Sequence, residues 1–277
     1  MTRNAGTPEH FIADDGMRIP LHIAGSGPAL VILHGWTGRW QDWQTILKRL
    51  QERFTCYVWE ARPYQAAATN ATLERMARDV QNLLDAFELE RPVLMGHSMG
   101  GLTSWEYIRQ FGDQRLSRLC IIDQSPRLLT SADWNLGLYG RYTEEDNEAF
   151  IADLRRNFAD TAIDKLIKRS RDGITDNPAV AAMLEARRQA FRTFAAEPWI
   201  VAWQSLSTND YRDVLPAISV PTLLIYGDAS RFYGTRVAEY VHANISDSVL
   251  KLYPNAGHSP QFENPETFVN HFIEFAS

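Results

Sequence analysis

The stretch Pro92-Val93-Leu94-Met95-Gly96-His97-Ser98-Met99-Gly100-Gly101 places one serine between glycines, directly after a short apolar run. This pattern is typical of a sharp turn from a strand into a helix, which forces the serine side chain outward. Gly96 and Gly100 stand where side chains would collide as the chain reverses, and Gly101 lets the helix pack closely. The sequence therefore predicts that Ser98 is a nucleophile.

Composition and charge limit the kind of protein that carries this turn. The chain has 277 residues, of which 45% are hydrophobic and 22% are charged, which suits one α/β domain with an inserted subdomain. The net charge of -6 is spread along the chain, and no basic stripe predicts binding to nucleic acid. Because no run could span a bilayer and residues 1–8 do not lead into a signal segment, we expect a cytoplasmic protein without a membrane partner.

The two cysteines predict neither a disulfide nor a metal site. Cys56 and Cys120 lie in strand-like apolar segments and have no CxxC partner or clustered histidines nearby. We expect both to be buried, and we expect no metal and no cofactor.

Strand-like and helix-like segments alternate in the first half of the chain, which predicts a parallel sheet with helices on both faces. The expected strands are 10–13 and 19–23, forming a hairpin, then 29–33, 56–59, 93–95, 119–122, 221–226 and 249–253. The expected helices are 44–53, 72–87, a helix through 102–108, and 265–275. The chain is thus predicted to form a mostly parallel eight-stranded sheet.

A helix-prone block interrupts this alternation after the sixth strand. We expect residues 128–216 to form a helical cap on a core made of 1–127 and 217–277, or else a set of ordinary packing helices that does not overhang the site. The block is rich in aromatic residues, and Trp134 and Tyr139 are candidates for substrate binding. Most of its aromatic side chains are expected to fill the block's own core.

Three ordered motifs give the chain its resemblance to a known family. They are His34-Gly35-Trp36 after an early strand, the glycine-flanked serine motif of residues 96–101, and Asn255-Ala256-Gly257-His258 after the last strand. In this order and strand context the chain resembles the α/β-hydrolase fold over nearly its whole length.

The chemistry of such a site assigns a role to several residues. A serine hydroxyl needs an imidazole to remove its proton, and His258, in a glycine-containing loop after a strand, is the natural base. The resemblance implies an oxyanion hole made by the backbone N–H groups of Trp36 and Met99. The Trp36 side chain predicts a pocket for an apolar or aromatic group.

Two further histidines belong to the motifs and are candidates for the pocket. His34 lies in the expected oxyanion loop, and His97 precedes the nucleophile. In a regular turn of this kind, however, the His97 side chain points away from the opening.

The acid of the site departs from the usual pattern of the family. Relatives most often carry it in a G-x-x-D arrangement, but here that window reads Gly227-Asp228-Ala229-Ser230, and a serine cannot ionise. Asp123 ends the strand next after the nucleophile strand, and neighbouring parallel strands deliver their last residues to the same edge of the sheet. Asp123 is therefore favoured as the acid, with Asp228 as the alternative.

Two functions remain open. The first is a serine hydrolase that cleaves a carboxylic ester or related acyl compound with an apolar or aromatic group, a small-molecule substrate, through an acyl-enzyme. The alternative is a cofactor-free dioxygenase similar to the quinolone-ring-cleaving members of the same fold, in which the histidine and its acid would deprotonate the heterocycle. Those enzymes have a histidine shortly after the oxyanion-loop tryptophan, whereas Thr37-Gly38-Arg39 follows here. The hydrolase is favoured, and the protein is expected to be a monomer or a homodimer.

Overall fold

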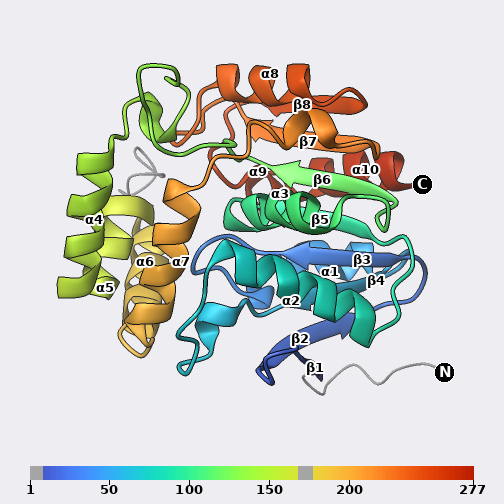
Figure 1. The fold of residues 1–277 in the computed structure, drawn as a ribbon, viewed down its shortest axis with the longest axis horizontal. Coiled ribbons are helices and arrows are strands. Elements are labelled where there is room, and N and C mark those ends of the chain that lie inside the picture. The colour runs from blue at the N-terminus through green and yellow to red at the C-terminus, as the bar shows by residue number, and fades with distance from the viewer. Residues whose placement is uncertain (1–8, 168–176) are drawn as a thin grey trace.

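The computed structural model describes residues 9–167 and 177–277, and its centre is a mostly parallel sheet (Figure 1). The strands are β1 Glu9–Ile12, β2 Arg18–Ala24, β3 Ala29–Leu33, β4 Thr55–Trp59, β5 Val93–His97, β6 Arg118–Ile122, β7 Thr222–Gly227 and β8 Ser248–Tyr253. Within the described residues they form one eight-stranded sheet in the order β1-β2-β4-β3-β5-β6-β7-β8. Strand β2 pairs antiparallel with β1 and β4, and the other pairs are parallel. The predicted fold class is confirmed.

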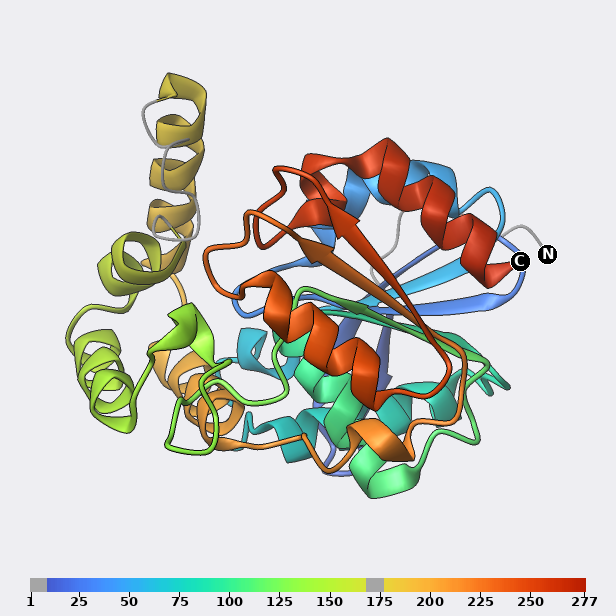
Figure 2. The ribbon, with the colours of Figure 1, turned by 90° about the horizontal axis from the view of Figure 1, so that it is seen from above.

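Helices cover both faces of this sheet (Figure 2). They are α1 Gln44–Leu50, α2 Leu73–Ala86, α3 Met99–Phe111, α8 Thr235–Asn244, the short α9 Pro260–Glu263 and α10 Pro265–Ala276. Helices α1 and α10 lie on one face, and α2, α3 and α8 lie on the other. Helix α8 was not predicted; three of its ten residues, Val237, Ala238 and Val241, are buried, and they face the sheet. None of the described helices combines the length and the apolarity needed to cross a bilayer.

The apolar run of β3 shows why the sheet is covered on both sides. Successive strand side chains point to opposite faces, so Leu30 and Ile32 pack in the core beneath α1 and α10, while Val31 and Leu33 pack toward α2 and α3. All four side chains are fully buried. Because helices cover both faces of β3, every residue of this strand has to be apolar, and the run is unbroken.

The predicted turn around Ser98 joins β5 directly to α3. Ser98 has φ 53° and ψ -120°, a conformation that L-residues rarely adopt and that costs about 1–3 kcal/mol. A Cβ atom on Gly96 would lie 2.3 Å from the Gly100 carbonyl oxygen, and one on Gly100 would lie 2.2 Å from that of Leu33. Both glycines are thus required by close backbone approach.

In the described part of the chain between β6 and β7 there are four α-helices, and they lie at one end of the sheet, on the left in Figure 1. They are α4 Glu144–Arg156, α5 Phe158–Thr161, α6 Pro178–Phe191 and α7 Ala196–Thr208. We refer to them as the inserted helices. Residues 168–176, which fall within the predicted cap, and residues 1–8, considered above for a signal segment, lie outside the described residues.

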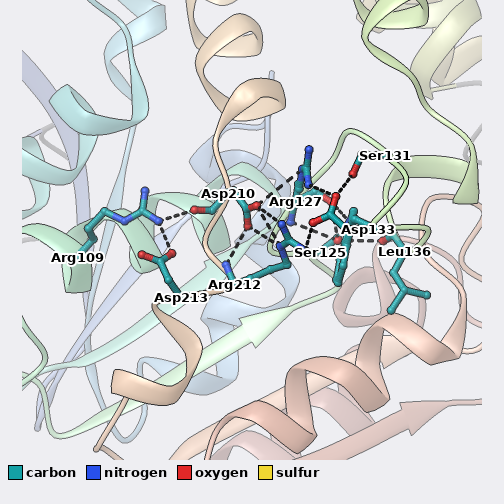
Figure 3. Close-up of polar contacts among 10 residues, drawn as sticks. Arg109, Ser125, Arg127, Ser131, Asp133, Leu136, Asp210, Arg212 and Asp213 are labelled. Carbon is teal, nitrogen blue, oxygen red and sulfur yellow. Dashed lines mark hydrogen bonds and ion pairs between the residues drawn. The ribbon is translucent and has the colours of Figure 1, made fainter.

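The two chain segments that lead into and out of the insertion are bonded to each other (Figure 3). Arg127 and Asp210 form an isolated antiparallel bridge. Arg212 donates to Asp210 Oδ2 at 2.7 Å and to Asp133 Oδ2 at 3.1 Å. Arg109 of α3 donates to the carbonyl oxygen of Asp210. This network fixes the start and the end of the insertion against the core.

Candidate active site

Three predicted site residues meet at the carboxyl ends of the parallel strands. Ser98 follows β5, Asp123 follows β6, and His258 lies in the loop after β8. Asp123 is fully buried, and its Oδ2 lies 2.6 Å from His258 Nδ1. Ser98 and His258 line the same pocket, which has a volume of about 290 Å³.

The hydrogen bonds of Asp123 determine the proton position on His258. Its Oδ2 also accepts from Ser230 Oγ at 2.8 Å, and its Oδ1 accepts from the Gly227 amide at 3.2 Å. A carboxylate only accepts hydrogen bonds, so the proton of a neutral His258 ring lies on Nδ1 and leaves Nε2 free to accept one. Sequence reasoning missed this contact of Ser230, although Ser230 stands where relatives usually carry the acid.

The alternative acid, Asp228, serves a different contact. Its side chain is exposed, and Oδ1 accepts a hydrogen bond from the Asn255 amide at 2.7 Å. Asn255 has φ 57°, so this bond holds a turn that the chain makes after β8. Asp228 shapes the loop that leads to His258 rather than contacting the imidazole.

The loop after β3 is held by His34. Nδ1 of His34 contacts the Gly35 carbonyl oxygen at 2.8 Å, and Nε2 accepts from the Ala61 amide at 3.1 Å. The second bond requires an unprotonated Nε2, so Nδ1 carries the proton and donates. The Gly35 oxygen also accepts from the Gly38 amide at 2.9 Å. Because the peptide is planar, these two donors also fix the direction of the Trp36 N–H group.

The two expected oxyanion donors both belong to residues that line the pocket, Trp36 and Met99. Met99 is the first residue of α3, so its amide has no partner within the helix. Within ranges 9–167 and 177–277, neither amide donates a hydrogen bond to another protein group.

The Trp36 side chain forms an aromatic wall together with the inserted helices. Its indole N–H donates to the Trp199 carbonyl oxygen at 2.9 Å. The ring packs against Trp203, with centroids 5.2 Å apart, and against Phe158 at 5.6 Å. Residues of α5 and α7 therefore hold the side chain that adjoins the nucleophile.

His97 differs from the expectation that its side chain points away from the opening. It lines the pocket, and its Nε2–H donates to the His258 carbonyl oxygen at 2.9 Å. Burial, and secondly the neighbouring His258, lower the pKa of His97 to about 3, so the ring is neutral. His97 thus anchors the backbone of the expected base.

Trp134 and Tyr139, the two predicted substrate contacts of the insertion, do not line this pocket. The Trp134 indole donates to the Arg127 carbonyl oxygen at 3.0 Å and packs on Tyr240 of α8, with centroids 4.8 Å apart. Tyr139 packs against Phe232, which itself lies against His258. The Trp134 ring is buried in packing, whereas Tyr139 is half-buried and lines a second cavity beside α4. Residue spacing alone could not distinguish these outcomes from a contact with the pocket at Ser98.

Most of the remaining pocket wall is apolar. It includes Leu128, Leu138, Leu166, Met183, Leu206, Phe232 and Phe262. One ion pair also lines it, formed by Arg187 of α6 and Asp42, with Nη2 and Oδ2 3.6 Å apart. The sequence offered no signal for this pair, because its members are 145 positions apart and lie in different segments.

Acid is expected to destabilise the protein through His34 and His97. Burial lowers the pKa of His34 to about 4, and that of His97 is about 3, whereas an unfolded chain titrates histidine near 6.5. Below pH 6.5 the two histidines therefore bind protons in the unfolded state but remain neutral in the folded state. Their contribution to the free energy of unfolding is complete above pH 6.5, and it is lost as the pH falls toward their pKa values in the folded protein.

We expect each histidine to lower the free energy of unfolding by up to about 2 kcal/mol between pH 7 and pH 5. Urea unfolding at the two pH values measures this loss. The variant His97→Asn is expected to show a smaller pH dependence than the wild type. An unfolding free energy that stays constant over this range would contradict the prediction.

The fold and the site together define a class of protein. A family model described as the alpha/beta hydrolase fold matches residues 28–265, and the chain belongs to this family. It is 28% identical over 264 residues to a pimeloyl-[acyl-carrier protein] methyl ester esterase from Nitrosospira multiformis, covering 91% of this chain and 95% of the relative. It is 24% identical to 3-oxoadipate enol-lactonase 1 from Acinetobacter baylyi, covering 94% and 93%.

A solved structure shows the same fold. An esterase from Exiguobacterium antarcticum superposes with a TM-score of 0.86 at 23% identity, covering 97% of this chain and 99% of that one. Taken with the relatives above, the chain is an esterase-like α/β hydrolase.

Proposed function

We propose that this protein is a serine hydrolase that cleaves a carboxylic ester or related acyl compound bearing an apolar or aromatic group. Ser98 is the nucleophile, and His258 acts first as the general base and then as the general acid. Asp123 is the carboxylate that orients the His258 imidazole. The observation that carries the proposal is the 2.6 Å contact between His258 Nδ1 and Asp123 Oδ2, beside a serine on a strained turn in the same pocket.

The reaction has two halves. Ser98 Oγ attacks the carbonyl carbon while its proton passes to His258 Nε2, and the carbonyl electron pair moves onto oxygen. The Trp36 and Met99 N–H groups stabilise this oxyanion. Collapse of the intermediate expels the alcohol, which takes the proton from His258 and leaves an acyl-enzyme. Water then attacks the acyl carbonyl while its proton passes to His258. Collapse of this second intermediate breaks the bond to Ser98 Oγ, which takes the proton back from His258, and the carboxylic acid leaves.

The inserted helices act as the cap of the site in this proposal, within the segment 128–216. Helix α6 contributes Met183 to the pocket wall, and α7 contributes Trp203 and Leu206. An apolar wall of this kind favours an apolar acyl or alcohol group, since burying such a group gains about 25 cal/mol per Å². The names of the relatives, an esterase and a lactonase, support acyl chemistry.

The wild-type protein tests the proposal directly. A fluorophosphonate probe is expected to add one label, located at Ser98 by peptide mapping. p-Nitrophenyl butyrate is expected to give a burst of one nitrophenolate per active site if deacylation is slow, and steady turnover otherwise.

A parallel assay with a hydroxyquinolone and an oxygen electrode covers the alternative. Oxygen consumption without ester turnover or labelling would replace the hydrolase with a cofactor-free dioxygenase that uses His258 and Asp123 as its base.

A further inference from the structure

The residue after the expected oxyanion donor has an unfavourable backbone conformation. Thr37 has φ 58°, in the left-handed region, and it is only 2% exposed. This conformation is rare for a β-branched residue, because its side chain crowds the neighbouring carbonyl oxygen. It persists only where surrounding contacts hold it.

Two side chains from distant segments hold the Thr37 carbonyl group. Arg187 Nη2 donates to its oxygen at 3.0 Å, and Tyr64 Oη donates to it at 3.3 Å. Arg187 comes from α6 among the inserted helices, whereas Tyr64 follows β4 in the core and packs on Trp199 of α7, with ring centroids 4.8 Å apart. The loop is thus tied to the insertion through Arg187 and, from the Trp36 indole, through Trp199.

The charge of Arg187 is partly offset at this position by Asp42, a carboxylate that also lies 3.9 Å from Arg39 Nε. Asp42 Oδ2 lies 3.6 Å from Nη2, and the guanidinium lies 5.7 Å from the centre of the Phe191 ring. The Arg187 side chain is 27% exposed. Because Asp42 is so close, Arg187 attracts an anionic substrate less strongly than an unpaired cation would. In this loop Arg187 donates a direct hydrogen bond to Thr37.

We propose that Arg187 is a positioning residue that holds Thr37 in its left-handed conformation and thereby keeps the Trp36 amide directed at the oxyanion. This inference rests on the proposed function. It means that the inserted helices support the oxyanion loop as well as cover the pocket: His34 and the Gly38 amide hold the Gly35–Trp36 peptide from the core, and Arg187 holds the Thr37 carbonyl group from α6.

The experiment compares Arg187→Met, Arg187→Lys and the control Arg192→Met. Methionine keeps much of the apolar stem but cannot donate, whereas lysine keeps one charged donor. Arg192 follows α6, is 55% exposed and does not line the pocket. Steady-state kinetics use a neutral ester, p-nitrophenyl butyrate, and an anionic one, the mono-p-nitrophenyl ester of succinic acid.

We expect Arg187→Met to lower kcat on the order of 10-fold to 100-fold for both esters, with KM changed less than threefold, because a misdirected donor loses transition-state stabilisation. Phosphonylation of Ser98 slows by a similar factor. Arg187→Lys recovers part of the loss, and Arg192→Met matches the wild type within about twofold.

Other results overturn the inference. If Arg187→Met keeps the wild-type kcat, the loop does not need Arg187 to hold Thr37. If the variant raises KM for the anionic ester and leaves the kinetics of the neutral ester unchanged, Arg187 binds the substrate carboxylate instead. A loss matched by a fall in the melting temperature and not relieved by lysine shows general destabilisation. Failure of the proposed function is distinct, since the wild type itself then shows neither labelling nor ester turnover.

Discussion

Replacing Ser98 with alanine is expected to lower kcat for ester hydrolysis by about 10⁴-fold or more and to abolish fluorophosphonate labelling. The magnitude follows from the nucleophile and base acting as a unit, so that losing one removes nearly the whole benefit of the set. Stopped assays with p-nitrophenyl butyrate at high enzyme concentration measure the residual rate. Some rate above that in water remains, because the oxyanion donors and the pocket still bind the ester.

This variant leaves the fold in place, which makes the loss interpretable. Alanine and serine carry the same Cβ atom, so the strain of the turn is unchanged, and within the described residues the Ser98 side chain caps no helix. The free energy of unfolding is expected to stay within about 0.5 kcal/mol of the wild type. Ser131→Ala, at an exposed serine, is the matched control and keeps full labelling. Ester turnover that survives Ser98→Ala at the wild-type rate would remove the acyl-enzyme from the mechanism.

The second large effect separates the two candidate acids. Asp123→Asn is expected to lower kcat by about 10³-fold to 10⁴-fold, because asparagine can donate to His258 Nδ1, favour the wrong tautomer and no longer stabilise the imidazolium. Asp228→Asn is expected to keep kcat within about threefold of the wild type, since its oxygen can still accept from Asn255. The same ester assay compares the two variants.

A compensating variant tests whether the loss of kcat in Asp123→Asn comes from the loss of the negative charge. Ser230 Oγ lies 2.8 Å from Asp123 Oδ2, so Ser230→Asp supplies a carboxylate beside the position that Asp123→Asn has lost. The double variant is expected to recover at least tenfold over Asp123→Asn alone. Equal kinetics for Asp123→Asn and the wild type would exclude Asp123 as the orienting acid.

Much of the fold was predictable because its signals are local. The apolar run of β3 and the alternation that follows it predict a sheet covered on both faces, and the observed strand bounds differ from the predicted ones by at most two residues at either end. Helix α8 was missed, although its buried residues Val237, Ala238 and Val241 stand at helical spacing.

The pocket was less predictable than the fold. His97 was expected to face away, yet it supports the His258 backbone, and Trp134 packs at the junction of the insertion and α8. The contribution of Arg187 has no signature in the sequence, because an arginine on a helix is most often a solvated side chain. Its contact with Thr37 spans 150 positions.

The sequence by itself determined the turn at Ser98, because a serine between glycines directly after an apolar run can be recognised from the order of a few residues. Gly96 is required by the approach of Gly100 within the turn, whereas Gly100 is required by the approach of Leu33 of β3. The order of the three motifs along the chain also indicated the α/β-hydrolase fold. Only the tertiary structure decided which carboxylate meets His258 and which insertion residues reach the oxyanion loop. Those contacts depend on how neighbouring strands end at one sheet edge and on how the inserted helices lie against it, and both are set by packing between segments far apart in the chain.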